Sequence, residues 1–231
     1  MKNYLVIGGS SGIGQALCEL LSDEGHTVYA SYCQHAQEDT GNIKYFQLDV
    51  LQPLPDLSWL PASIDGVVYC PGSIKLRPFH RIKVADFAKD YELQVLGAIK
   101  ILQTVLPALK QSASASVVLF STVAVQTGFP FHAQVASSKG ALEGLMRSLA
   151  ADFAPKIRVN CVAPSLTDTP LAATLLNSTA KLEANAARHP LKRVGTASEI
   201  AAAAAYLLSD NAAWMTGQVL KLDGGMSSLK I

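Results

Sequence analysis

The sequence has little excess charge and few features that point to a large partner. Its 231 residues include 19 Lys and Arg against 18 Asp and Glu, a formal net charge of +1, so no basic stripe suggests nucleic-acid binding. The longest apolar run, 200–208, is too short and too rich in alanine to span a bilayer. These absences predict a small-molecule ligand, with neither a nucleic acid nor a membrane as partner.

Cysteine is scarce, and its spacing excludes the common metal motifs. Cys18, Cys33, Cys70 and Cys161 form no C-x-x-C pair, so we expect small buried thiols, with no disulfide and no metal site. Residues 1–7 contain one lysine and an apolar run shorter than the h-region of a signal peptide, and they suit a first strand better. We therefore expect a cytoplasmic protein.

The composition predicts one globular domain over residues 1–231. Hydrophobic residues make up 49% of the chain and charged residues 16%, which suits a buried parallel sheet. No stretch rich in proline, glycine and serine divides the sequence. We expect a single core.

A glycine-rich turn organises the start of the chain. Gly8, Gly12 and Gly14 lie between the apolar run 4–7 and the amphipathic stretch 13–21. Glycines let a backbone approach a pyrophosphate, and a helix that starts there offers unpaired N–H groups and a positive dipole end. The spacing G-x-x-x-G-x-G is weak by itself, but the strand and helix on either side of it favour a dinucleotide site over an ordinary loop.

The rest of the chain alternates between strand and helix patterns, which predicts an α/β fold. Helical periodicity covers 84–107, 133–153 and 196–208. Thr196 and Glu199 form a capping box at the start of the third helix. Gly97 interrupts the helix over 84–107, and a glycine inside a helix indicates close packing there. Six further strands are predicted at 26–32, 42–50, 64–70, 116–120, 157–163 and 218–222. The stretch 166–188, with small residues near its centre, is expected to form a mobile helical lid that fits many ligands.

The end of the second predicted strand bears on the choice of cofactor. An acidic residue there would bind the ribose 2′-hydroxyl of NAD, but Tyr32, Cys33 and Gln34 occupy the position. No arginine is present for a 2′-phosphate, and Ser11 stands at a loop position where a basic residue could meet it. The sequence therefore favours NADP only slightly over NAD.

Five separated segments of the sequence carry a common pattern: 8–14, 48–50, 158–164, 190–208 and 223–225. Together they resemble the short-chain dehydrogenase/reductase family along nearly the whole chain. The resemblance implies a single-domain, Rossmann-type, doubly wound parallel sheet of about seven strands in the order 3-2-1-4-5-6-7, with helices on both faces. It implies an NAD(P)-dependent oxidoreductase, usually a homodimer or homotetramer, that moves a hydride between a nicotinamide cofactor and a small carbonyl, alcohol or conjugated alkene.

The resemblance also implies which residues hold the cofactor. The glycines would bind the pyrophosphate, Asp49 and Val50 the adenine, Gly72 the adenosine ribose, and Thr167 and Thr169 the nicotinamide carboxamide. Ile7, the segment 69–72 and Ser165 depart from the usual residues at their positions. The full expected set is Gly8, Ser10, Ser11, Gly12, Ile13, Gly14, Tyr32, Asp49, Val50, Cys70, Pro71, Gly72, Lys139, Pro164, Thr167 and Thr169.

The catalytic half of the family pattern is altered. The Tyr-x-x-x-Lys motif would place its tyrosine at Val135, which has no proton to give, while its lysine falls on Lys139. The family serine falls on Thr122, which still offers a hydroxyl, and the family asparagine falls on Gln94. By residue type alone, Lys139 would more often face solvent on a helix; by resemblance it would bind the nicotinamide ribose.

His132 is a further candidate. Enoyl-thioester reductases of this fold place a tyrosine seven residues before the lysine, and His132 stands at that distance here. Reduction of a conjugated C=C forms an enolate that hydrogen bonds can stabilise, and a histidine can relay a proton near neutral pH. The other interpretation, a surface histidine at the start of a helix, stays open at this point and has the better odds.

Two hypotheses for the function follow. The first is an oxidoreductase with altered proton delivery. The second is a nicotinamide-binding sensor or partner subunit without turnover, suggested by Val135 and Gln94. Gly97 and the alanine-rich and leucine-rich faces that follow Lys139 suit packing between subunits.

Overall fold

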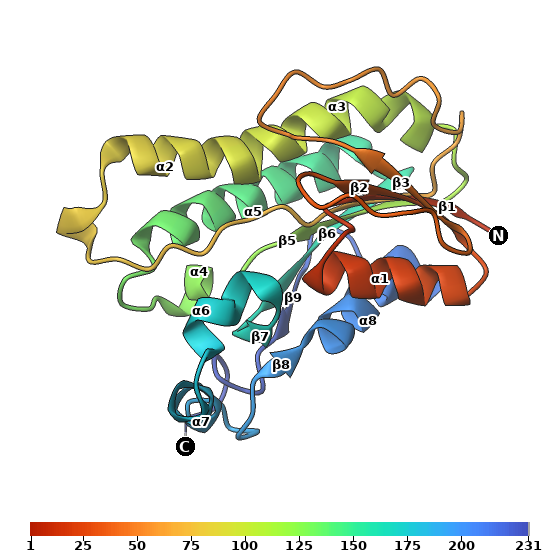
Figure 1. Ribbon diagram of the computed structural model, residues 1–231. Coiled ribbons are helices and arrows are strands. Elements are labelled where there is room, and N and C mark those ends of the chain that lie inside the picture. The colour runs from red at the N-terminus through yellow and green to blue at the C-terminus, as the bar shows by residue number, and fades with distance from the viewer. Residues whose placement is uncertain (231) are drawn as a thin grey trace.

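The computed structural model describes residues 1–230 and places seven strands in one parallel sheet. The order is β3-β2-β1-β4-β5-β6-β9 (Figure 1), which confirms the predicted order with β9 as the seventh strand of the sheet. The strands are β1 (Asn3–Ile7), β2 (Thr27–Tyr32), β3 (Ile43–Gln47), β4 (Gly66–Tyr69), β5 (Ala115–Phe120), β6 (Ile157–Pro164) and β9 (Val219–Leu222).

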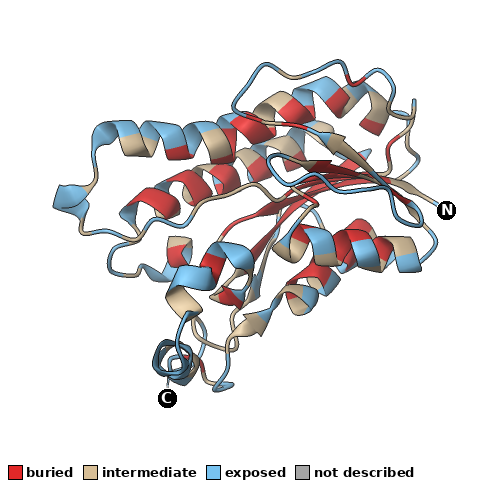
Figure 2. Ribbon diagram, in the orientation of Figure 1, coloured by how far each residue is buried: buried red, intermediate tan, exposed pale blue. Residues whose placement is uncertain are grey.

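Helices cover both faces of the sheet, as expected for a doubly wound fold. α1 (Gly12–Asp23) packs beside α8 (Ala197–Leu208) on one face, while α2 (Val84–Tyr91), α3 (Gly97–Leu109) and α5 (Ala133–Phe153) lie on the other (Figure 1). Successive side chains of a strand point to opposite faces. Leu5 and Ile7 therefore belong to the core under α3 and α5, while Tyr4 and Val6 belong to the core under α1 and α8. The buried strands between these layers are visible in Figure 2.

The single helix predicted over 84–107 is interrupted at its centre. One π-helical turn, Glu92–Leu96, separates α2 from α3. Gly97 follows that turn, and a Cβ there would collide with the Tyr69 hydroxyl, which donates to the Leu93 carbonyl at 2.5 Å. Gly97 is thus needed for close packing inside the chain, and its expected part in subunit packing stays a prediction.

The continuous helical stretch Val84–Leu109 is long and apolar enough to cross a membrane by length and composition. However, Ala98, Ile101, Val105 and Leu109 are buried, and they belong to the core between α3 and the sheet. A core helix of a globular protein passes the same test, so this stretch is weak support for a membrane span.

Several predicted strands extend too far. The third was expected over 42–50, but β3 ends at Gln47, because the Asp49 carboxylate accepts a hydrogen bond from the Leu51 amide and turns the chain. The fourth was expected over 64–70 and covers only Gly66–Tyr69. The helix over 133–153 has the predicted bounds, and Thr196 and Glu199 form the expected capping box of α8.

Residues 166–188 are largely helical, as predicted for the lid. They contain β7 (Thr167–Asp168), a 3-10 turn at Pro170–Ala172, α6 (Ala173–Leu176) and α7 (Thr179–Ala187). β7 pairs with β8 (Gly195–Thr196) in a second, two-stranded sheet that the sequence did not predict. The mobility of this segment stays a prediction.

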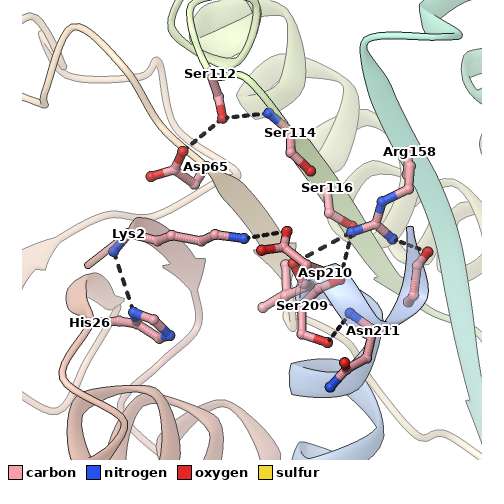
Figure 3. A network of polar contacts seen from close by, with 12 residues as sticks. Lys2, His26, Asp65, Ser112, Ser114, Ser116, Arg158, Ser209, Asp210 and Asn211 are labelled. Carbon is pink, nitrogen blue, oxygen red and sulfur yellow. Dashed lines mark hydrogen bonds and ion pairs between the residues drawn. The ribbon is translucent and has the colours of Figure 1, made fainter.

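The amino-terminal edge of the sheet is held by a polar network. Arg158 on β6 donates to the carbonyls of Leu207, Leu208, Ser209 and Ala212, at the end of α8 (Figure 3). At the same edge, shown in Figure 3, the ammonium of Lys2 pairs with the carboxylate of Asp210 at 2.7 Å. These contacts tie α8 to the sheet, which leaves the opposite, carboxyl-terminal edge for a ligand.

The cysteines are free thiols, and most of them are shielded. Cys18 and Cys161 are buried and Cys70 is half-buried. Cys33 is exposed in the loop after β2, so the expectation of burial was wrong there, because that loop has no helix packed over it.

Candidate active site

The glycine turn after β1 forms a cradle that larger residues would fill. Gly8 and Gly12 have φ of +78° and +54°, a region that favours glycine, and a Cβ at Gly14 would collide with the Gly8 carbonyl. Ser11 is the N-cap of α1, and its side chain makes no capping bond. The first amides of α1 therefore point outward without a partner in the turn, as an anion site requires.

The expected adenosine side of the site lies beyond this cradle. Ser31 at the end of β2 accepts a hydrogen bond from the Gly8 amide at 2.9 Å, which fixes the turn against the sheet. Tyr32 and Asp49 are half-buried and Val50 is buried, at the carboxyl ends of β2 and β3. Neither an acidic nor a basic side chain occupies 32–34.

A cavity of about 240 Å³ opens at the carboxyl ends of the central strands. It is lined by ten of the residues predicted for the site, contributed by α1, α5, the π turn and the ends of β4, β5 and β6. These are Ile13, Cys70, Gly72, Gln94, Thr122, His132, Lys139, Pro164, Thr167 and Thr169. The other predicted residues lie around this cavity. The adjacent turns hold Gly8, Ser10, Ser11 and Pro71, the first turn of α1 holds Gly12 and Gly14, and the strand ends beyond them hold Tyr32, Asp49 and Val50. Most of the remaining lining is apolar, including Ile74, Leu76, Phe129, Leu166, Leu171 and Leu175.

Lys139 and Val135 lie four residues apart on α5, and both line this cavity. Lys139 is 8% exposed, so the interpretation of a solvent-facing lysine is wrong. Burial lowers the pKa of its ammonium to about 8, although the nearby Cys161, Asp90 and Cys70 act in the opposite direction. The branched side chain of Val135 stands where the resemblance expects a phenol.

Thr122 and its neighbour Ser121 have different roles at the end of β5. The Thr122 oxygen accepts a weak bond from the Ala124 amide at 3.3 Å, which leaves its own hydrogen free to donate toward the cavity. The Ser121 hydroxyl instead donates to the buried carboxylate of Glu143 at 2.7 Å. Thr122 is therefore the hydroxyl available to a ligand oxygen.

Gln94 belongs to a buried polar chain that the sequence analysis missed. Its amide nitrogen donates to the Asp90 carboxylate at 2.7 Å, and the Ser73 hydroxyl makes a very short hydrogen bond to the other oxygen of Asp90. Gln94 is fully buried and Asp90 is 4% exposed. The spacing of four residues on a helix could have indicated the pair, but Asp90 resembled one more polar residue of an amphipathic pattern.

His132 lies at the start of α5, half-buried, with its ring against Phe129 at 5.5 Å between centroids. Its Nδ1 lies 2.7 Å from the Pro130 carbonyl, which can only accept, so Nδ1 carries the hydrogen. In the neutral ring Nε2 is then an acceptor, and only the imidazolium could donate from it.

The position that resemblance assigns to glycine holds Ser165, and its side chain is engaged. The Ser165 hydroxyl lies 2.9 Å from Nε2 of the buried His189, whose Nδ1 lies 2.9 Å from the Asn185 carbonyl. Since that carbonyl only accepts, Nδ1 carries the hydrogen and Ser165 donates to Nε2. This pair links the end of α7 to the end of β6, and no sequence pattern indicated it.

The residues fit a nicotinamide dinucleotide. The cradle and the open amides of α1 suit a pyrophosphate, and the cavity that Ile13, Lys139 and Thr167 line would take the nicotinamide ring. In a doubly wound sheet, ligands bind in the crevice at the carboxyl ends of the strands, where this cavity lies. Fold and site together define a dinucleotide-binding α/β protein.

Comparison with known proteins agrees with this class. A family model described as Enoyl-(Acyl carrier protein) reductase matches residues 58–227. A 2,5-dichloro-2,5-cyclohexadiene-1,4-diol dehydrogenase of Sphingobium indicum is 30% identical over 99% of this chain and 98% of its own length. The FabG 3-oxoacyl-[acyl-carrier-protein] reductase of Thermotoga maritima is 29% identical over 97% of each chain.

A solved structure is similar over nearly its whole length. The active-site complex of Pseudomonas aeruginosa RhlG with NADP has a TM-score of 0.88 and 28% identity, covering 98% of this chain and 96% of that one. The chain belongs to the short-chain dehydrogenase/reductase family. The relatives that share its length are oxidoreductases, named as dehydrogenases and reductases.

Proposed function

We propose that the protein is an NAD(P)-dependent oxidoreductase that transfers a hydride to or from a small carbonyl, alcohol or conjugated alkene, with altered proton delivery. One observation supports this most strongly: a single cavity is lined by Ile13 beside the glycine cradle and by Thr122 and Lys139. A cofactor held by the cradle would bring its reacting ring next to the two polar groups.

Different residues of the chain would have different roles in the reaction. The bound nicotinamide cofactor supplies or accepts the hydride. The Thr122 hydroxyl donates to the substrate oxygen, which positions the carbonyl and stabilises the charge that develops there. The apolar lining, including Leu166, Leu171 and Leu175, excludes water and suits an apolar substrate. Val135 has no proton to give, so the proton comes from another group.

A conjugated alkene and a ketone place different demands on this site. Alkene reduction forms an enolate whose oxygen needs only hydrogen bonds at first, whereas ketone reduction needs a proton on oxygen. The match to a model described as Enoyl-(Acyl carrier protein) reductase supports the alkene, and the 3-oxoacyl reductase among the relatives supports the ketone. His132 and Lys139 are the candidate proton donors, because both ring nitrogens of the other histidine at the cavity, His189, are already bonded.

NADP is the favoured cofactor. The half-buried Tyr32 and the exposed Cys33 and Gln34 offer no carboxylate to bind the 2′-hydroxyl of NAD, and the exposed Ser11 leaves room for a phosphate. The complex of a 28% identical relative with NADP supports the choice. Side-by-side titration should show NADPH binding at least as tightly as NADH, and a clear preference for NADH would reject this part of the proposal.

The experiment combines binding with turnover. NADPH binding would be followed by cofactor fluorescence and thermal shift, and NADPH consumption by absorbance, with a ketone, an enone and an enoyl thioester as acceptors. The proposal expects consumption with at least one of them at an enzymic rate. Binding without consumption across the panel, and without reduction of NADP by the matching alcohols, would favour the alternative of a nicotinamide-binding sensor or partner subunit.

We further propose a homodimer or homotetramer that works in the cytoplasm. Exposed apolar side chains, Val84, Tyr91 and Leu96, follow α2 and the π turn on the outside of the helical layer. Such residues suit packing against a second copy. Sedimentation that finds only a monomer at micromolar concentration would contradict the assembly.

A further inference from the structure

Asp90 sits at the centre of a buried chain of hydrogen bonds that ends beside Lys139. The carboxylate accepts from the Ser73 hydroxyl on one oxygen and from the Gln94 amide on the other. Ser73 lies in the loop after β4, and Gln94 lies in the π turn that interrupts the long helix. A π turn often marks a functional site, and this one aims Gln94 at the cavity.

The far end of Gln94 has no partner. Its carbonyl oxygen is buried and unbonded in the described structure, which is unfavourable unless something binds it. A Cβ placed on Gly72 would lie 3.4 Å from this oxygen and 3.6 Å from Nζ of Lys139. The Gln94 carbonyl oxygen and Nζ of Lys139 therefore face the same point above Gly72. There the lysine or a bridging water can donate a hydrogen bond to that oxygen.

The charge on Lys139 depends on few neighbours. Cys70 after β4 and Cys161 on β6 face it, but burial raises the pKa of each thiol to about 12, so both are neutral where the lysine titrates. On its own helix, Glu143 is bonded to Ser121 and paired with Arg147. Asp90 from α2 is the negative charge that remains to support the ammonium.

We propose that Asp90 is a positioning residue that keeps Lys139 in its ammonium form through Gln94, and that this ammonium protonates the substrate oxygen in place of the missing phenol. The inference rests on the proposed function and adds the proton donor to it. Lys139 lines the cavity on the same face of α5 as Val135, one turn away, and the smaller Val135 leaves the path to a substrate open.

The step balances without a further reactant. The reduced nicotinamide cofactor would supply the hydride, whose C–H bond to the cofactor breaks as the new C–H bond forms at the carbonyl carbon. The π pair of the C=O moves to oxygen, and an Nζ–H bond of Lys139 breaks as the O–H bond forms. Lys139 is left as a neutral amine and regains a proton from water at the cavity mouth. Alcohol oxidation runs the same transfers in reverse, with the neutral amine as base. A buried lysine whose pKa lies about 8 is suited to both directions near neutral pH.

The first test measures the lysine directly, in protein without cofactor. NMR titration of side-chain-labelled lysine, with the Lys139 signal assigned by its loss in Lys139→Met, should give a midpoint near 8 in the wild type. Asp90→Asn removes the charge and keeps the shape, so the midpoint should fall by about one unit. Asp86→Asn, one turn earlier on α2, is the matched control and should leave the midpoint unchanged. An unchanged midpoint in Asp90→Asn would overturn the role of Asp90.

The second test separates binding from proton transfer. Lys139→Arg keeps a cation but cannot release its proton, so NADPH binding should persist while kcat for ketone reduction falls by about 10²- to 10⁴-fold. In Asp90→Asn the fall of kcat with rising pH should begin at lower pH than in the wild type, with the NADPH Kd little changed. A Lys139→Arg protein that binds NADPH and reduces the ketone at the wild-type rate would reject the ammonium as donor.

These outcomes also separate the inference from the proposed function. A wild-type protein that binds NADPH and turns over no acceptor rejects the proposed function, and the donor role of Lys139 with it. The NMR titration still decides whether Asp90 sets the charge of Lys139. If the wild type turns over an acceptor and Lys139→Arg does so at the same rate, the proposed oxidoreductase function is retained. Only the role of Lys139 as proton donor is then rejected.

Discussion

The substitution Val135→Tyr would restore the phenol that the family pattern places on α5. Val135 is buried at 7% exposure, lines the cavity and lies one helical turn before Lys139 on the same face. A tyrosine there would place its hydroxyl beside the ammonium and opposite Thr122. The positive charge of Lys139 should lower the pKa of the new phenol, which makes it a better acid.

The size of the effect follows from the role. A positioned general acid contributes about 10²- to 10⁴-fold, which corresponds to about 3–5 kcal/mol of barrier. Val135→Tyr should gain only part of that range, because the ammonium of Lys139 is proposed to supply a proton already in the wild type. Enlarging a well-packed residue costs about 1–3 kcal/mol of stability. The side chain of Val135 borders an open cavity and does not face the core on all sides, so the cost here should not exceed that range. The folded protein should tolerate that cost, because domains of this size have about 5–15 kcal/mol of stability.

The assay compares ketone-dependent NADPH consumption in Val135→Tyr, in the wild type and in Val135→Phe. The phenylalanine variant adds the same ring without the hydroxyl, so it separates proton donation from a change in cavity shape. We expect a gain for Val135→Tyr over both, and loss of that gain when Lys139→Ala is added. If Val135→Tyr folds, binds NADPH and performs no better than Val135→Phe, the alignment of this pocket and the site assignments derived from it must be abandoned.

Three further predictions concern stability. Thr196→Ala removes the side-chain cap of α8, where the Thr196 oxygen accepts from the Glu199 amide at 3.3 Å, and should lower the free energy of unfolding by about 1 kcal/mol in urea titrations. Arg158→Met leaves the carbonyls at the end of α8 without their buried donor, so urea unfolding should show a loss of about 3 kcal/mol, with Arg158→Lys losing less. The buried Lys139 has a pKa of about 8 against an ordinary 10.5, so the unfolded chain binds more protons between these values. Stability should therefore rise with pH across that window, and a wild-type slope that matches the slope of Lys139→Met would contradict the burial.

The sheet and the cofactor turn could be predicted from the sequence because their signals are local. A strand, a glycine turn and a helix follow one another between residues 4 and 21. Position 14 must be glycine because a Cβ there would collide with the carbonyl oxygen of Gly8. Strand order came from a resemblance that extends over the whole chain. The strand ends and the π turn at Glu92–Leu96 were missed because one side-chain bond, such as that of Asp49 to the Leu51 amide, decides them.

The catalytic groups could be located from the sequence but their states could not. Lys139 fits a solvated helix by residue type, and only the packing of α5 against β6 shows that it is buried. Asp90 lay within an amphipathic pattern, and its importance depends on Ser73, a residue brought to it by the loop after β4. Burial and long-range pairing depend on the tertiary structure, which local periodicity does not encode.

By resemblance, both halves of the expected site depart from the family pattern, but the glycines of the cofactor turn are kept, and this has a physical reason. Cofactor binding depends on backbone geometry in the turn at Gly8–Gly14, where almost any side chain would collide or strain the chain. In the proposed function, proton delivery depends on side chains such as Asp90 and Lys139, which project from intact helices. A change there alters the chemistry without altering the fold, because helices tolerate exchange of one side chain at a cavity wall far better than a turn tolerates a new Cβ. The cofactor site can therefore persist while the group that supplies the proton is replaced.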